Sequence, residues 1–92
     1  MKAKTIQFDR VFEKSWNKYL AGLTEKQKKN LRERLAIFKQ DIFDKRLKTH
    51  RLKGNLKDYY AFSISYSDRI VFKIIEDNSV YLIEIGSHDV CY

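Results

Sequence analysis

The chain has 92 residues, of which 43% are hydrophobic and 14% aromatic, and its formal net charge at pH 7 is +7. This length predicts one domain, residues 1–92, with a single core. No apolar run reaches the ~18 residues that a membrane-spanning helix needs, and no apolar segment of signal-peptide length follows the first residues. A single cysteine, Cys91, cannot form an internal disulfide, so we expect a cytoplasmic protein in which Cys91 is simply a small side chain.

Positive charge is unevenly distributed along the chain. Residues 1–57 contain 17 Lys and Arg against 6 Asp and Glu, whereas residues 58–92 contain 2 against 6. The basic part is suited to a polyanion or to an acidic protein partner. For scattered lysines, however, an ordinary solvated surface is the better interpretation of the charge alone.

Two helices are predicted in the first half. Residues 5–8 alternate as a short strand with Ile6 and Phe8 inward, and Asp9 is a plausible N-cap for a helix to about Leu20, ended by Gly22. Its apolar stripe consists of Phe12, Trp16, and Tyr19 or Leu20. A Trp in such a stripe belongs to the core more often than to a nucleobase platform.

A second, longer helix begins at the capping-box pattern Thr24–Gln27 and is expected to reach about Asp44. Its buried ridge is Leu31, Leu35, Phe38 and Ile42, and its other face carries Lys26, Lys28, Lys29, Arg32 and Lys39. A short connection makes the two helices an antiparallel hairpin, which can cover only one face of a sheet.

The segment 45–57, which we call the basic loop, is the most polarised part of the sequence. It contains six basic residues and His50 but no acidic residue. Leu47, Leu52 and Leu56 are expected to hold it against the domain, and Gly54-Asn55 to form a turn.

From Tyr59 onward the sequence predicts three strands separated by two polar breaks, residues 66–68 and 77–78. A two-residue hairpin at 77–78 places Phe72 opposite Ile83 and Ile74 opposite Tyr81. For the first break, an odd, three-residue loop keeps the apolar residues on one face, because a one-residue slip reverses every side chain.

These registers predict which residues share each face of the sheet. The helix-covered face is expected to hold Tyr60, Phe62, Ile64, Ile70, Phe72, Ile74, Ile83 and Ile85. The polar face carries Ser63, Ser65, Arg69, Lys73 and Glu84. The predicted fold is therefore α+β, a single β-α-α-β-β-β domain with two N-terminal helices on one face of a small, mainly antiparallel sheet.

Several chemistries find no support in the sequence. Two histidines and one cysteine without metal-ligand spacing do not make a convincing metal site. The three glycines stand singly, which argues against a phosphate-binding loop, and no serine lies in a nucleophile elbow. We therefore expect neither a metal nor a small-molecule cofactor.

Metal-free RNA cleavage suits the residues that remain. That reaction needs a base for the 2′-hydroxyl proton, an acid for the leaving 5′ oxygen, and cations for the phosphate charge. Histidine can perform either proton transfer near its ordinary pKa of about 6.5. His88 and Tyr92 are four residues apart, and Arg69 offers a fork for phosphate oxygens. From spacing alone, a lone histidine such as His88 is more often structural or merely exposed than catalytic.

Four segments, in their order, resemble a known superfamily. They are Phe38–Phe43, His50–Gly54, Arg69–Phe72 and Ile85–Tyr92. With them, nearly the whole chain resembles the RelE/ParE superfamily of bacterial toxins, and within it the RelE-like and YafQ-like mRNA interferases. The resemblance implies a RelE-like fold, cleavage of mRNA in the ribosomal A site, and inhibition by a co-expressed antitoxin.

The resemblance also assigns individual residues. The YafQ-like loop histidine corresponds to His50, the catalytic C-terminal histidine to His88, and the terminal aromatic residue to Tyr92. The RelE-like strand arginine corresponds best to Arg69. Departures occur in the sheet.

Those departures all place serines at functional positions. The YafQ-like mid-sheet histidine falls at Ser63 and its aspartate at Ser67, with Asp68 adjacent. The RelE-like mid-sheet lysines fall at Ser63 and Ser65. A site without those groups would be slower, or would depend more on His50 and the ribosome.

The leading hypothesis is a type II toxin that acts as a metal-independent, ribosome-dependent mRNA endonuclease. His88 would be the acid, His50 the base, Arg69 the stabiliser of phosphate charge, and Tyr92 would orient or stack the substrate. The residues expected to hold the RNA backbone are Lys48, Arg51, Lys53, Lys57 and Lys73. Expected partners are the ribosome, mRNA and an acidic antitoxin. The alternatives are a non-catalytic, ParE-like gyrase inhibitor and an RNA- or ribosome-binding domain whose catalytic site has decayed.

Overall fold

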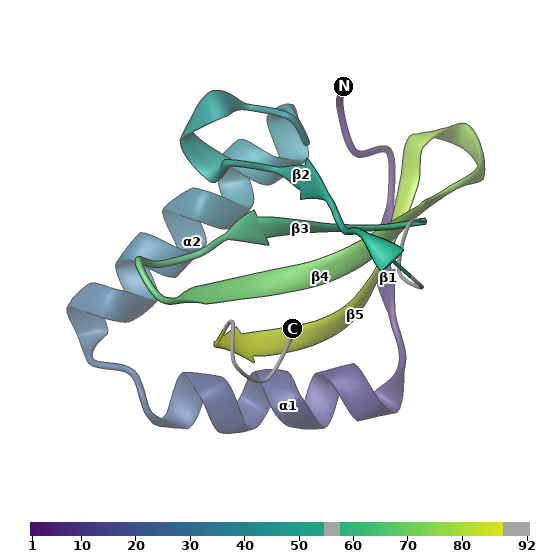
Figure 1. Cartoon of the computed structure of the whole chain (residues 1–92). Coiled ribbons are helices and arrows are strands. Elements are labelled where there is room, and N and C mark those ends of the chain that lie inside the picture. Colours follow the sequence, from purple (N-terminus) through teal and green to yellow (C-terminus); the bar gives the residue numbers. More distant parts are fainter. Residues whose placement is uncertain (55–57, 88–92) are drawn as a thin grey trace.

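The computed structural model of the chain describes residues 1–54 and 58–87 (Figure 1). A strand and two helices come first, and the remaining strands follow. The elements are β1 (Ile6–Phe8), α1 (Arg10–Ala21), α2 (Glu25–Gln40), the 3₁₀ helix η1 (Lys45–Leu47), β2 (His50–Arg51), β3 (Tyr59–Ser63), β4 (Asp68–Ile75), the 3₁₀ helix η3 (Glu76–Asn78) and β5 (Ser79–Ser87). None of the described helices is long and apolar enough to cross a membrane.

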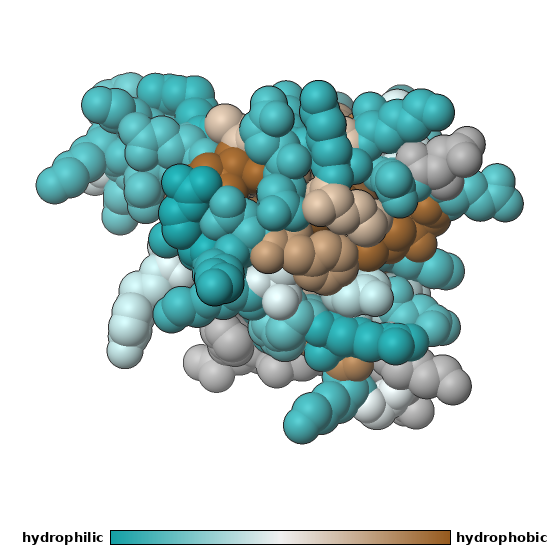
Figure 2. Space-filling model, turned by 90° about the horizontal axis from the view of Figure 1, so that it is seen from above, coloured by the Kyte–Doolittle hydropathy of each residue, from teal (hydrophilic) through white to brown (hydrophobic). Residues whose placement is uncertain are grey.

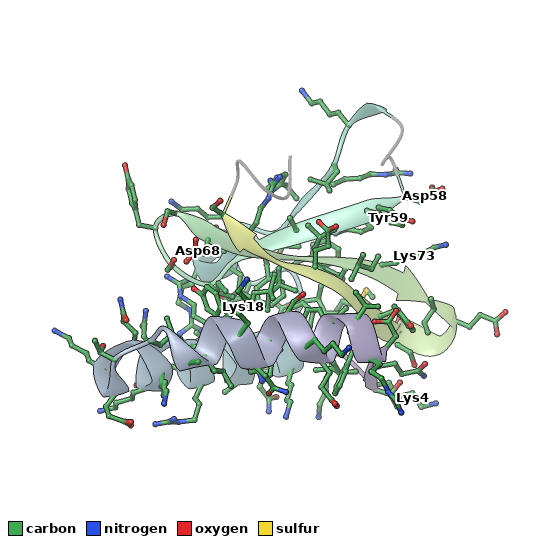
Figure 3. All side chains as sticks on the ribbon, turned by 90° about the horizontal axis from the view of Figure 1, so that it is seen from below. Lys4, Lys18, Asp58, Tyr59, Asp68 and Lys73 are labelled. Carbon is green, nitrogen blue, oxygen red and sulfur yellow. The ribbon has the colours of Figure 1, made fainter. Side chains whose placement is uncertain are left out.

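The strands form one sheet in the order β1-β5-β4-β3-β2, with β1 parallel to β5 and the other pairs antiparallel. Both helices lie on the same side of this sheet, and within residues 1–54 and 58–87 no helix covers the opposite face (Figure 3). The predicted α+β fold is confirmed. Strand β2 was not predicted, because its two residues carry no alternating pattern and form a strand only by pairing with Tyr60 and Ala61.

Local hydrogen bonds explain where the helices begin. The Asp9 carboxylate accepts from the amide of Phe12 at 2.9 Å. Thr24 and Gln27 form both bonds of the capping box, at 3.2 and 2.9 Å. Gly22 follows the last residue of α1, as predicted.

Helix α2 ends at Gln40, so the predicted end near Asp44 was wrong. The backbone of Asp41 is extended, and its carboxylate accepts from the amide of Phe43 at 3.1 Å and from the amino group of Met1 at 2.7 Å. Short acidic side chains that bond nearby backbone groups compete with helix continuation, and here the competing bonds prevail.

The aromatic ring of Phe38 links α2 to the middle of the sheet. It stacks on Phe62 with ring centroids 4.2 Å apart and meets the edge of Phe72 at 5.1 Å. The buried core around these rings consists of Phe12, Leu31, Phe38, Ile42, Leu47, Phe62, Ile64, Ile70, Phe72, Val80, Leu82 and Ile85. Both predicted helical stripes face it, whereas Phe8, on the edge strand β1, remains 48% exposed.

The first hairpin has the predicted faces but a different register. Tyr60 lies opposite Phe72 and Phe62 opposite Ile70, which is a shift of two residues from the prediction. Because side chains alternate with a period of two, an even shift leaves the paired strand residues on their predicted faces. Accordingly, Phe62 and Ile64 are buried in the helix-covered core. Ser65, in the loop beyond the pairing, contradicts the prediction, because it lies beside the Tyr19 hydroxyl and lines a hollow with Leu31 on the helix side.

The second hairpin contradicts the two-residue turn. Residues 76–78 form a 3₁₀ turn in which Asn78 has a φ of 62°, and this places Phe72 opposite Leu82 rather than Ile83. A bulge between Val71 and Phe72 then restores the predicted pairing of Ile70 with Ile85. Val80 and Leu82, not Ile83, therefore complete the core.

Tyr19 joins α1 to the first residue of β4. Its hydroxyl donates to Oδ2 of Asp68 at 2.7 Å. Burial, followed by the hydrogen bond to and charge of Asp68, raises the pKa of Tyr19 from 10.0 to about 12. The folded chain therefore favours the neutral phenol.

We expect Tyr19→Phe to lower the free energy of unfolding by about 1 kcal/mol at pH 7, because it removes one hydrogen bond while keeping the ring. The contribution of the hydroxyl is complete below pH 10 and is lost as pH rises toward 12, since the unfolded chain releases this proton first. Urea denaturation at pH 7 to 11 should show the two proteins converging in stability. A constant difference across this range would contradict the assignment.

Candidate functional site

The sheet face without helices, which we call the open face, is organised in three rows of paired residues. Strand pairing places these side chains next to one another across the sheet. The first row is Ser63, Arg69 and Gly86; the second is His50, Ala61, Val71 and Glu84; the third is Tyr59, Lys73 and Tyr81.

The centre of the open face is apolar. Leu52, Ala61 and Val71 are buried there and form a second small cluster, with Tyr59 packed against it. Leu52 thus holds the basic loop to the sheet, as predicted, and Leu47 is fully buried in the main core. The polar residues of this face surround an apolar centre, which the alternating pattern did not reveal because Val71 lies in a continuous apolar run.

His50 lies at the edge of the open face, on β2, and its side chain is exposed. Its Nδ1 is 3.0 Å from the carbonyl oxygen of Lys48. Since a carbonyl can only accept, Nδ1 carries the proton, and Nε2 of the neutral ring is left with a lone pair. This tautomer can act as a general base at Nε2.

Arg69 projects from a central strand on the same face as His50, yet only 4% of it is exposed. From strand spacing and rise, the Cα atoms of the two residues are about 12 Å apart. The side chains of His50 and Arg69 can therefore approach a shared ligand, although the two residues are not partners in the strand pairing.

The predicted backbone-binding residues are spread over two surfaces. Lys48 and Lys53 are exposed in the basic loop, and Lys73 is exposed in the third row, on the side away from α1 (Figure 3). Arg51 pairs with Tyr60, on the helix side of β2, and its guanidinium is 3.7 Å from the Asp58 carboxylate. The side of the molecule that carries the segment between α2 and β2 is mostly hydrophilic (Figure 2).

Three of the predicted site residues, Lys57, His88 and Tyr92, lie outside the described residues, as do Leu56 and Asn55. The described residues do show where β5 ends in the sheet. Ser87, the residue before His88, pairs with Asp68 at the start of β4. Arg69 is the next residue of that strand.

The serines at family positions occupy distinct places. Ser63 lies beside Arg69 on the open face and is partly exposed, so the prediction that it is not beneath the helices is confirmed. Asp68, in contrast, is on the helix side, where it accepts from Tyr19. Asp68 therefore does not supply a carboxylate to the open face in place of the family aspartate that falls at Ser67. The sequence carried no signal for this contact, which joins residues 49 positions apart.

Within the described ranges, no three His, Cys, Asp or Glu side chains are grouped so that they could hold a metal ion. The described part of the site consists instead of an exposed imidazole, a guanidinium and scattered ammonium groups. Such a set can exchange a proton and attract an anion.

The comparisons with known proteins concern the family and the fold. Residues 4–91 match the family model described as a bacterial toxin of a type II toxin-antitoxin system, YafQ. No curated protein matches the chain.

Solved structures with the same fold include other bacterial toxins. YafQ from Escherichia coli strain BL21(DE3) has a TM-score of 0.71 at 16% identity, covering 95% of this chain and 96% of that one. YafQ in the E. coli DinJ-YafQ complex has a TM-score of 0.71 at 15% identity, covering 100% and 99%. A metal-bound toxin from Helicobacter pylori has a TM-score of 0.68 at 26% identity, covering 96% and 98%. With the family model matched over almost its whole length, this chain belongs to the YafQ family of bacterial toxins of type II toxin-antitoxin systems.

Proposed function

We propose that this toxin is a metal-independent endoribonuclease that cuts mRNA on the ribosome. The observation that supports it most is the exposed His50, whose Nδ1 contact with the Lys48 carbonyl leaves Nε2 available as a base on the face that carries Arg69. A surface that served only for protein binding would have no use for a histidine held in one tautomer on the same face as a guanidinium.

The proposed reaction is an internal transfer at phosphorus. Nε2 of His50 takes the proton of a 2′-hydroxyl, and the resulting oxygen attacks the adjacent phosphate. His88 gives a proton to the departing 5′ oxygen, which leaves a 2′,3′-cyclic phosphate and a 5′-hydroxyl. Arg69 stabilises the charge on the phosphate oxygens, and Tyr92 orients or stacks the substrate.

Partners follow from the charge distribution and the family. We infer an acidic antitoxin, because residues 1–57 carry 17 basic against 6 acidic side chains. The E. coli DinJ-YafQ complex supports a protein antitoxin for this chain as well. Ribosomal RNA and mRNA are the polyanions for which the basic loop is suited, which places the toxin's action in the cytoplasm.

Induction of the toxin in cells, followed by mapping of RNA 5′ ends, tests the function. We expect new ends within translated messages, in frame with their codons, and none on the same messages when their start codons are removed. Stalled replication with intact mRNA would instead indicate a ParE-like gyrase inhibitor. Ribosome binding without new ends would indicate a decayed catalytic site.

His88→Ala should reduce the cleavage rate by about 10²–10⁴-fold with little change in ribosome affinity, because it removes the general acid. A thermal melt of the same variant provides the control. If the variant loses activity only by unfolding, or stays fully active, the assignment of His88 as the acid is wrong.

Tyr92→Phe distinguishes the two roles proposed for the terminal ring. A small loss of rate indicates stacking, and a loss close to that of His88→Ala indicates that the hydroxyl orients the phosphate. The loss of activation free energy in the double variant should be far smaller than the sum of the two single losses, since the two groups act as one catalytic unit. Additive losses would separate Tyr92 from the catalytic unit.

Replacement of both Arg51 and Lys53 by Ala should weaken RNA binding and reduce the salt dependence of the affinity. Each single-strand phosphate contact contributes about 0.7 to the slope of log K against log salt, so we expect the slope to change by about 1.4. The matched control replaces Lys14 and Lys39, which are exposed on the helices. Equal changes in both pairs would assign Arg51 and Lys53 to the general solvated surface.

A further inference from the structure

The loop between β3 and β4, residues 64–67, contains a tyrosine whose ring covers none of the protein. Tyr66 is fully exposed. Single exposed apolar residues are common on protein surfaces and indicate nothing by themselves. Tyr66 differs from them in two respects, namely the rigidity of its loop and the hollow that it borders.

The loop is held in place by its own hydrogen bonds. The amides of Ile64 and Ser65 donate to the carbonyl oxygen of Asp68 at 3.1 and 3.4 Å, and the amide of Asp68 donates to Oγ of Ser65 at 3.1 Å. Tyr19 then fixes the Asp68 carboxylate to α1 at 2.7 Å. Tyr66 is therefore presented on a pre-organised loop, so the binding of a ligand costs little entropy for ordering that loop.

A hollow of about 280 Å³ lies between this loop and the start of α2. The buried side chains of Leu31 and Ile64 give it an apolar floor, while Asn30 and Ser67 add an amide and a hydroxyl at its wall. Tyr66 borders the same hollow. This volume is slightly below the range of small-molecule sites, roughly 300–1,000 Å³, and is suited to a single planar ring rather than to a whole ligand.

The Asp68 carboxylate, which is held by Tyr19, also lines the hollow, and positive charge lies next to it. Asn30 also borders a neighbouring surface depression that Lys26 and Lys29 line, together with one carboxylate, that of Glu33. An apolar floor, an aromatic ring, an amide and adjacent ammonium groups together match the ring face, the polar edge and the phosphate of a nucleotide. A protein partner would be expected to need a broader apolar groove.

We propose that this hollow is a subsite for one unpaired RNA base, with Tyr66 stacked on the base and Asn30 hydrogen-bonded to its edge. The inference rests on the proposed function in that the substrate is RNA. Asp68, at the end of the loop, pairs with Ser87 and precedes Arg69, so the subsite lies at the end of the sheet where Arg69 and the end of β5 are located. It would select a base near the cut.

The test is a titration of the ¹⁵N-labelled full chain with a short single-stranded oligoribonucleotide. We expect amide shifts at residues 64–68 and at Asn30. Tyr66→Ala should weaken binding about 10-fold, the effect typical of losing one stacked base, and Tyr66→Phe should retain it. The matched control is Phe8→Ala, because Phe8 is another exposed aromatic residue, on the edge strand β1. Shifts confined to other surfaces, or equal losses in both alanine variants, would overturn the subsite.

Further outcomes separate the subsite from the function. Amide shifts in the loop without any cleavage of mRNA would support the subsite and contradict the nuclease function. Normal cleavage and unchanged RNA binding by Tyr66→Ala would contradict the subsite and support the nuclease function. A changed sequence around the cuts in Tyr66→Ala identifies a base of mRNA as the ligand. Weaker ribosome binding with an unchanged cut pattern identifies a base of ribosomal RNA. Loss of antitoxin binding alone would show that the surface docks a protein, contrary to the proposal.

Discussion

The stack of Phe38 on Phe62, completed by Phe72, is the contact on which the arrangement of the molecule depends. It fixes α2 against the two central strands of the sheet, and α1 must follow because the connection between the helices is short. Both helices thus occupy one face. Chemistry that needs access to a large substrate is left with the open face, the basic loop and the ends of the strands.

Much of the fold could be predicted because the face of each strand residue depends only on whether a loop has an odd or an even number of residues, and not on the exact register. Side chains on strands alternate, so the odd first loop determined the faces even though the register differed by two residues. The prediction for the second hairpin was wrong because there the turn changed the pairing by an odd number of residues. Its three-residue turn and the bulge near Val71 each shift the pairing by one, and together they exchange Ile83 for Leu82 while leaving Ile85 in the core. No local pattern marks a bulge that corrects a turn.

The candidate site could be predicted as residue types but not as geometry. Placement of Arg69 and Lys73 on the open face followed from alternation, whereas the contact of His50 with its own loop carbonyl is a backbone detail. The tie between Tyr19 and Asp68 joins two elements distant in sequence, and it shows that Asp68 is committed to holding the fold. That tie also fixes the loop of Tyr66, so stability and the proposed recognition of RNA share one hydrogen bond.

The central claim is that the open face, and not the outer surface of α1, meets RNA. Two charge reversals compare the faces directly, Lys73→Glu in the third row of the open face and Lys14→Glu on the exposed side of α1. The measured quantity is the affinity of each variant for ribosomes at fixed salt, with a thermal melt to confirm folding. The account predicts that Lys73→Glu weakens binding by at least about 10-fold, because an attraction becomes a repulsion, while Lys14→Glu changes it by less than about twofold. Equal effects, or a larger effect of Lys14→Glu, would contradict it.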